Sequence, residues 1–233
     1  MITINNITLA YQSKTILTSA SATFTRGTLT ALVGRNGAGK STLLRAAAAI
    51  DRPQSGTVTV EGNNLHTLSA DKRAELISFV GTHRVRVANL KCRDVVAIGR
   101  APYTNWLGSM QPQDEQIVTD ALRAVGMEHF AQRAIDSLSD GECQRIMIAR
   151  ALAQQTPIIM LDEPTAFLDI PTRFEICRLL AELTRQGKTI IFSTHDIDAA
   201  LPVCDNIAVI ENHDLTLYPA PAAEGVLKRL FSL

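Results

Sequence analysis

The amino-acid sequence predicts an α/β protein with a parallel sheet and an inserted helical subdomain. Short apolar runs typical of buried strands occur at 28–33, 57–60, 158–161, 189–193 and 207–210. Helical segments alternate with these runs, at 41–50, 172–186 and 197–204. Strands separated by helices favour a parallel sheet, because each helix carries the chain back to the starting edge. The stretch 87–155 is mostly helical, apart from a turn-rich segment at 99–113, and indicates the inserted subdomain.

The opening residues predict short strands joined by turns. The apolar side chains Ile2, Ile4, Ile7 and Leu9 are spaced as in a half-buried strand. The pair Asn5-Asn6 is typical of a turn. No internal repeat or low-complexity tract interrupts the chain, so we expect one domain with its subdomains.

Composition excludes some classes of protein. The 233 residues are 46% hydrophobic, enough for a sizeable core. Lys plus Arg and Asp plus Glu both total 23, so no basic excess exists to neutralise a nucleic-acid backbone. The four cysteines are far apart and form no CxxC pair, which is typical of free thiols in a reducing compartment. We therefore expect no nucleic-acid partner and no disulfide framework.

The sequence also predicts a soluble chain. Its first residues, MITINNITLAYQ, lack the basic and apolar regions of a signal peptide. No run approaches 18 apolar residues, the length that a membrane-spanning helix needs. We expect a cytosolic protein, and any membrane role has to come through a partner.

The segment GRNGAGKS at 34–41 fits the phosphate-binding pattern G-x-x-x-x-G-K-[ST] completely, between an expected strand and an expected helix. Glycines let several backbone N–H groups converge on phosphate oxygens, and the helix start turns its positive end toward the same anion. Lys40 adds a point charge, and Ser41 offers a hydroxyl to Mg²⁺. The alternative is a glycine-rich turn before a helix, which matches by chance in about one chain in a hundred of this length. The expected nucleotide-binding residues are Gly34, Arg35, Asn36, Gly37, Ala38, Gly39, Lys40, Ser41 and Thr42.

Two further strand ends carry candidate catalytic groups. The apolar run 158–161 is followed by Asp162, which fits a Mg²⁺ ligand, and by Glu163, which can act as general base toward a water molecule. His195 follows the run 189–193, at the sheet edge where α/β proteins bind ligands. A solvated strand end before a proline turn is the alternative for Asp162 and Glu163. The upstream phosphate loop favours function.

The segment LSDGE at 138–142 predicts a helix start. Ser139 and Glu142 have the spacing of a capping box before an apolar run.

The motifs GRNGAGKS, LSDGECQR, IIMLDEPTAFLD and STHD, in this order, resemble those of the nucleotide-binding subunits of ABC transporters over essentially the whole chain. The resemblance implies ATP and Mg²⁺ as cofactors, and a head-to-tail homodimer. One subunit's phosphate loop and the other's Ser139, Asp140, Gly141 and Glu142 then enclose ATP. It also implies that Asp169 lies at the dimer interface, that His195 senses the γ-phosphate, and that Tyr11 stacks on adenine. A tyrosine on a strand face is the alternative for Tyr11.

The same resemblance implies the domain organisation. The whole chain, 1–233, would be a single ABC ATPase domain. Its P-loop NTPase (RecA-like) core would comprise 1–86 and 155–233, with a parallel sheet and an N-terminal antiparallel β subdomain. The helical subdomain, 87–154, would carry LSDGE.

A narrower resemblance involves the turn-rich loop. Gly99-Arg-Ala-Pro-Tyr103 and the following Thr-Asn-Trp106 are similar to the importers of iron–siderophore, haem and cobalamin complexes. This implies an ATP-hydrolysing importer subunit on the cytoplasmic face of the inner membrane. Its partners would be transmembrane permease subunits and, indirectly, a periplasmic or surface substrate-binding protein. Tyr103 and Trp106 are candidates to face the permease, although Trp106 in the core of the subdomain is an equal alternative.

One departure from the family concerns the metal. The family usually has a glutamine after the strand that ends near Val80, in contact with Mg²⁺ and water. Here Thr82, with His83 next, stands at that point and is the candidate replacement.

Rival functions remain open to different degrees. A soluble ABC-type ATPase, for example in iron–sulfur assembly, fits the motifs but leaves the 99–106 loop unexplained. A P-loop kinase or GTPase leaves LSDGE and the STHD histidine unexplained, and the chain has no NKxD. The cargo and the direction of transport are not encoded in these motifs.

Overall fold

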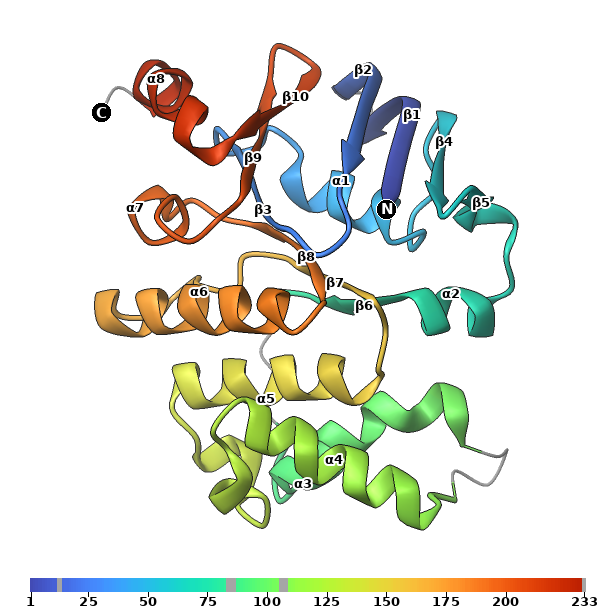
Figure 1. The fold of residues 1–233 in the computed structure, drawn as a ribbon, viewed down its shortest axis with the longest axis vertical. Coiled ribbons are helices and arrows are strands. Elements are labelled where there is room, and N and C mark those ends of the chain that lie inside the picture. Colours follow the sequence, from blue (N-terminus) through green and yellow to red (C-terminus); the bar gives the residue numbers. More distant parts are fainter. Residues whose placement is uncertain (12–13, 83–86, 105–108, 232–233) are drawn as a thin grey trace.

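The computed structural model describes residues 1–11, 14–82, 87–104 and 109–231. In Figure 1 a small sheet lies at the top right, a larger sheet crosses the middle, and helices α3, α4 and α5 lie at the bottom.

The larger sheet has six strands in the order β10-β9-β3-β8-β7-β6. All neighbouring strands from β9 to β6 are parallel, and only β10 is antiparallel. The predicted parallel sheet is therefore confirmed. Its strands are β3 (Leu29–Gly34), β6 (Ile77–Val80), β7 (Ile158–Leu161), β8 (Thr189–Ser193), β9 (Asn206–Glu211) and β10 (Asp214–Pro219). Strands β3, β7 and β8 are buried along their whole length, as expected of strands covered on both faces.

The small sheet is antiparallel, in the order β2-β1-β4-β5. It consists of β1 (Ile2–Tyr11), β2 (Lys14–Phe24), β4 (Ser55–Val60) and β5 (Asn63–Asn64). The turn expected at Asn5-Asn6 is wrong, because β1 continues through both residues. The pairing register shifts between Ile4 and Ile7, and Asn6 has a φ of 46°. A bulge thus absorbs the left-handed residue, a conformation that asparagine tolerates better than most residues.

The helices surround these sheets. They are α1 (Lys40–Ala47), α2 (Ala70–Leu76), α3 (Cys92–Ala97), α4 (Pro112–Ala124), α5 (Asp140–Ala153), α6 (Ile170–Arg185), α7 (Ile197–Ala200) and α8 (Ala220–Phe231). The expected helix at 172–186 is present as α6. The helix expected at 197–204 ends as an α-helix at Ala200, and the chain continues in turns to 203.

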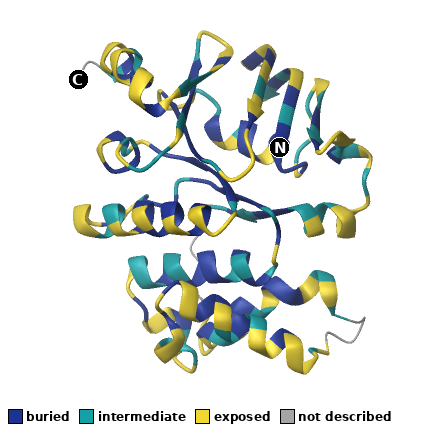
Figure 2. Cartoon of the chain, in the orientation of Figure 1, coloured by how far each residue is buried: buried dark blue, intermediate teal, exposed yellow. Residues whose placement is uncertain are grey.

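The core is divided by the larger sheet. Ile190 and Phe192 of β8 belong to a hydrophobic cluster shared with α3, α4, α5 and α6. Ile191 belongs to a second cluster, which is shared with α1 and the small sheet. This alternation follows from the two-residue period of a strand. Figure 2 shows the buried residues running through the middle of the molecule, with exposed residues on the outer helices.

A buried ion pair and its hydrogen bonds join a 3-10 helix to α4 and α5. Arg100 lies in the 3-10 helix Ile98–Tyr103, and its Nε donates to Asp114 of α4 at 2.9 Å. Its Nη1 donates to the carbonyl of Ala153, at the end of α5, also at 2.9 Å. Both residues are 5% exposed. The N–H of Gln111, followed by Arg100, holds the pKa of Asp114 below its ordinary value.

We expect Asp114→Asn to lower the free energy of unfolding by about 3 kcal/mol, because it leaves the buried Arg100 charge without its partner. Urea unfolding at pH 7 measures the loss. The lowered pKa means that this stabilisation is complete above the ordinary aspartate pKa and disappears as the pH falls through the lowered one. The control is Asp120→Asn on the same helix, whose pair with Arg123 is exposed and contributes at most about 1 kcal/mol. Equal losses in the two variants would contradict the assignment.

Candidate functional site

The candidate site lies at the carboxyl edge of the parallel sheet. The loop between Gly34 and Lys40 follows β3, Asp162 and Glu163 follow β7, and His195 follows β8. Because β8 pairs with both β3 and β7, residues distant in sequence meet at this edge. This is where open α/β sheets bind their ligands.

The phosphate loop depends on glycine at 39. Gly39 has a φ of 97°, and a Cβ there would lie 2.0 Å from Cγ2 of Ile16 on β2. Any side chain at this position would collide with the small sheet. Lys40 begins α1, is 5% exposed, and its Nζ donates to the carbonyl of Gly34 at 3.3 Å. The loop is thus closed back on itself by its own lysine.

Three charged or titratable groups meet beside this loop. Nε2 of His195 lies 2.6 Å from Oε1 of Glu163 and 3.0 Å from Nζ of Lys40. The same Oε1 lies 3.8 Å from Nζ of Lys40. One imidazole nitrogen cannot donate to Glu163 and accept from Lys40 at once, so the tautomer of His195 selects between these contacts.

Burial and neighbouring charges shift the pKa of Lys40 in opposite directions. Desolvation lowers the pKa of Lys40, and the nearby carboxylates of Glu163 and Asp162 partly offset that effect. The cation therefore depends on negative neighbours, and phosphate oxygens can supply the same compensation.

A second group of contacts centres on Asp162. Its Oδ1 accepts from the hydroxyl of Ser41 at 2.9 Å and from the hydroxyl of Ser193 at 2.6 Å. Carboxylate and hydroxyl oxygens suit Mg²⁺, which takes few protein ligands and keeps several waters. The residues present therefore fit a magnesium ion held by Ser41 and Asp162.

Ser193 is a site residue that the sequence analysis missed. Besides donating to Asp162, its hydroxyl accepts from the N–H of Glu163 at 2.9 Å. It thus fixes both carboxylate residues relative to β8. The available signal was the serine before Thr194 and His195, at the end of a strand that neighbours β7.

The LSDGE segment starts α5 as predicted. Oγ of Ser139 accepts from the N–H of Glu142 at 3.3 Å, and Glu142 accepts from the N–H of Ser139 at 2.8 Å, so the capping box is confirmed. Donation from the N–H and from the hydroxyl of Ser139 to the Glu142 carboxylate lowers the pKa of Glu142. A Cβ at Gly141 would lie 2.6 Å from Cγ2 of Thr172, so glycine allows α5 to start close against α6.

Asp169 lies across a groove from Ser139. It caps α6, accepting from the N–H of Thr172 at 2.9 Å. The groove has a volume of about 470 Å³, and it is lined by residues 139–142 and by Asp169, but by no residue of the phosphate loop. Within one chain, Ser139 and Asp169 therefore line the same groove, and neither lines the pocket that adjoins the phosphate loop.

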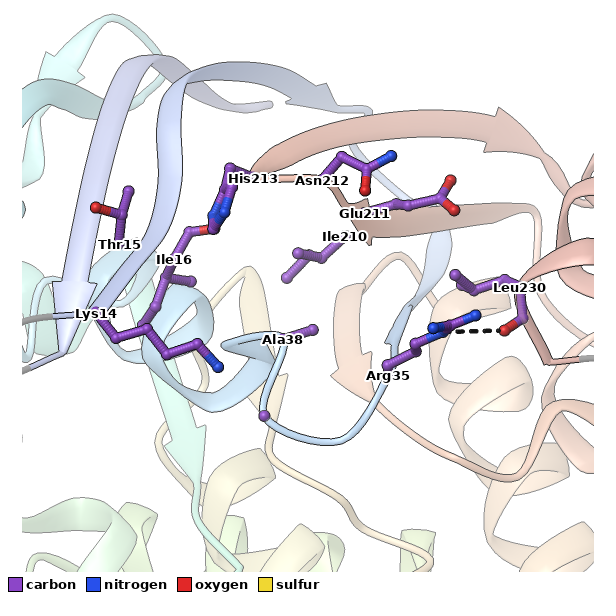
Figure 3. Close-up of a pocket in the computed structure, with 11 residues that line it drawn as sticks. Lys14, Thr15, Ile16, Arg35, Ala38, Ile210, Glu211, Asn212, His213 and Leu230 are labelled. Atoms are coloured by element: carbon purple, nitrogen blue, oxygen red, sulfur yellow. Dashed lines mark hydrogen bonds between the residues drawn. The ribbon is translucent and has the colours of Figure 1, made fainter.

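The remaining predicted residues are Tyr11, Thr82, His83 and Trp106. Tyr11, at the end of β1, is 64% exposed. A pocket of about 400 Å³ adjoins the phosphate loop through Arg35 and Ala38, and it is enclosed by β2 and the turn between β9 and β10 (Figure 3). Tyr11 does not line it. Thr82 is exposed and lines a small cleft with Glu163. His83 and Trp106 lie outside the described residues.

The fold and this edge define a P-loop nucleotide-binding protein. The family model described as ABC transporter matches residues 17–166. The achromobactin transport ATP-binding protein of Dickeya dadantii is 38% identical over 236 residues, which cover 100% of this chain and 88% of the relative. The ferric enterobactin transport ATP-binding protein of Escherichia coli is 31% identical, over 97% of this chain and 85% of the relative. The chain belongs to the family of ABC transporter ATP-binding proteins.

Solved structures agree with this assignment. An inward-facing ABC transporter described as of metal-chelate type matches with a TM-score of 0.87 and 28% identity, over 100% of this chain and 89% of that one. The dimeric cassette MJ0796, in a post-hydrolysis state with ADP and Pi, matches with a TM-score of 0.80 and 27% identity, over 94% and 99% of the two chains. Within the part of this chain that the structure describes, no helix is long and apolar enough to cross a bilayer.

Proposed function

We propose that this chain is the ATP-hydrolysing subunit of a bacterial ABC importer, and that it energises uptake of an iron–siderophore, haem or cobalamin-type chelate. The observation that carries the catalytic part is the meeting of Lys40, Glu163 and His195 at the edge of the sheet. The transport part is supported by relatives named for achromobactin transport, ferric enterobactin transport and cobalamin import.

In the proposed reaction, the loop at 34–42 and Lys40 bind the β- and γ-phosphates. Ser41 and Asp162 would hold Mg²⁺, which would neutralise phosphate charge, and Thr82 is the candidate additional ligand. Glu163 accepts the proton of the attacking water. His195 keeps the Glu163 carboxylate in place through the 2.6 Å contact and extends toward the γ-phosphate.

Two copies of the chain would pack head to tail, with Ser139 of each facing the nucleotide of the other. The separation of the LSDGE groove from the phosphate loop supports this arrangement, because one chain alone does not complete the site. Two large apolar side chains flank Asp169: Phe167 is 76% exposed and Ile170 is 67% exposed. Such exposure next to a predicted interface residue is typical of a surface that a partner covers. Tyr11 would stack on the adenine.

A permease would bind the helical subdomain, and the chain would reach the cytoplasmic face of the membrane through it. Among the described residues, Val87, Ile98 and Tyr103 are exposed by 51%, 54% and 40%. All three belong to the segment between β6 and α4 that also contains the importer-like loop. A substrate-binding protein would act through the permease alone.

Reconstitution with the permease tests the proposed function. The subunit and a candidate permease are placed in proteoliposomes, and ATP-driven uptake of ferric siderophore, haem and cobalamin is measured. Uptake of one of these chelates that requires both ATP and this subunit is the expected result. An active ATPase that binds no permease would instead favour the soluble alternative.

Tyr103→Ala should reduce chelate uptake several-fold while basal ATP hydrolysis by the isolated subunit stays within about twofold. Cζ of Arg100 lies 4.1 Å from the centroid of the Tyr103 ring, and the Tyr103 hydroxyl donates to the carbonyl of Gln154 at 3.0 Å. These two contacts hold the exposed edge of the ring in a fixed position. Tyr103→Phe, which keeps the ring, is the control. Loss of folding in Tyr103→Ala, seen as a large fall in melting temperature, would show that the ring is structural instead.

A further inference from the structure

A narrow cleft lies between α5 and the segment that follows β7. Its polar part is lined by Asp140 and Gln144 of α5, by Glu163 and by Thr82. Its volume is about 20 Å³, and one ordered water molecule needs roughly 10–15 Å³. The cleft can therefore hold one water molecule and little else.

The amide of Gln144 is the group that such a water would satisfy. Its Nε2 is buried and has no hydrogen-bond acceptor among the described residues. An unsatisfied buried donor is costly, and native proteins usually satisfy it with protein groups or ordered water.

Glu163 can accept from the same water. Its contacts to His195 and Lys40 both use Oε1, which leaves Oε2 available to a further donor. The hydroxyl of Thr82, on the same cleft, can make a third contact, within the two to four that buried waters usually have. Met147 and Leu168 form an apolar wall, which favours the polar end as the position of the water.

We propose that Gln144 is a positioning residue for Glu163 and acts through one water molecule held in this cleft. The amide N–H of Gln144 donates to the water, and the water donates to Oε2 of Glu163. With Oε1 held by His195, both oxygens of the carboxylate are then oriented. The inference rests on the proposed function, in which Glu163 is the general base.

The position of Gln144 on α5 gives this contact a second consequence. Ser139 caps the same helix and, in the proposed dimer, faces the nucleotide of the partner subunit. Gln144 lies five residues further along and reaches the base of its own subunit. One helix thus connects the two ATP sites of the dimer.

Gln144→Met tests the proposal, because methionine has a similar length but cannot donate. We expect kcat for ATP hydrolysis to fall roughly three- to tenfold, the effect of one hydrogen bond, with KM for ATP and the melting temperature nearly unchanged. Gln116→Met makes the same substitution at an exposed position of α4, away from the cleft, and is the control, expected to keep kcat within twofold.

A crystal structure of the wild-type protein gives a readout that does not depend on activity. A water within about 3.2 Å of Nε2 of Gln144 and of Glu163 is expected, and an unfilled cleft at high resolution would overturn the proposal. Unchanged kcat in Gln144→Met, or parallel changes in kcat, KM and melting temperature, would also overturn it. Absence of ATP hydrolysis by the wild type would refute the proposed function instead, whatever the cleft contains.

Discussion

Glu163→Gln should leave ATP binding intact and lower turnover by about 100-fold or more. Glutamine keeps the shape of the side chain but cannot take a proton from water, and a positioned general base contributes about 10²- to 10⁴-fold. The contact to His195 at 2.6 Å and the pairing with Lys40 at 3.8 Å hold the carboxylate beside the phosphate loop. ATP should therefore persist uncleaved and hold two subunits together.

Steady-state phosphate release, ATP binding and sedimentation of the variant with ATP measure these three effects. Glu75→Gln, an exposed carboxylate on α2, is the control and should behave as wild type. Turnover of Glu163→Gln near the wild-type rate would assign the base to another residue.

Mixed dimers should show that Ser139 acts on the partner's nucleotide. With Lys40→Ala in one subunit and Ser139→Ala in the other, both changes fall in one composite site, and the second site stays intact. With both changes in one subunit, each site carries one of them. Removing a buried charge partner costs roughly 2–5 kcal/mol, so Lys40→Ala alone should weaken ATP binding on the order of 100-fold.

The first arrangement should retain one intact site, which binds one ATP per dimer with high affinity and can close. In the second arrangement, neither site should both bind ATP tightly and close. Equilibrium binding and ATP-dependent dimer formation, measured on differently tagged subunits, distinguish the two. Because Ser139→Ala also removes a helix cap worth about 1 kcal/mol, Ser69→Ala, which removes the cap of α2, measures that effect alone. Equal occupancy in the two arrangements would exclude the role in trans.

Local patterns predicted the parts of the site that are local. The phosphate loop follows from glycine conformation and helix polarity within eight residues, and the Ser139 capping box from a spacing of three. The order of elements also predicted the parallel sheet. The bulge at Asn6 was missed, because an asparagine pair is equally typical of a turn, and only pairing with β2 and β4 keeps the strand continuous.

Contacts across the sheet were beyond sequence reasoning. Ser193 meets Asp162, and Gln144 shares a cleft with Glu163, over separations that no periodicity records. The helix α8 was also missed, since Gly225 lowers its intrinsic propensity, whereas burial of Leu227 and Leu230 in the core stabilises it. The burial of Arg100 could not be predicted either, because its partner Asp114 lies on another helix.

The hydrogen bond of Arg100 attaches a neighbouring segment to one end of α5. Arg100 joins the 3-10 helix that bears Tyr103 to the carbonyl of Ala153, at one end of α5. The 14 residues of this helix span about 21 Å, and Ser139 stands at the other end. A hydrogen-bonded helix is stiffer than a loop, so we expect a displacement at the Tyr103 end to move Ser139 as well. In the proposed dimer, a movement at the permease-facing surface and a movement at the nucleotide would therefore be transmitted along the same helix, in opposite directions.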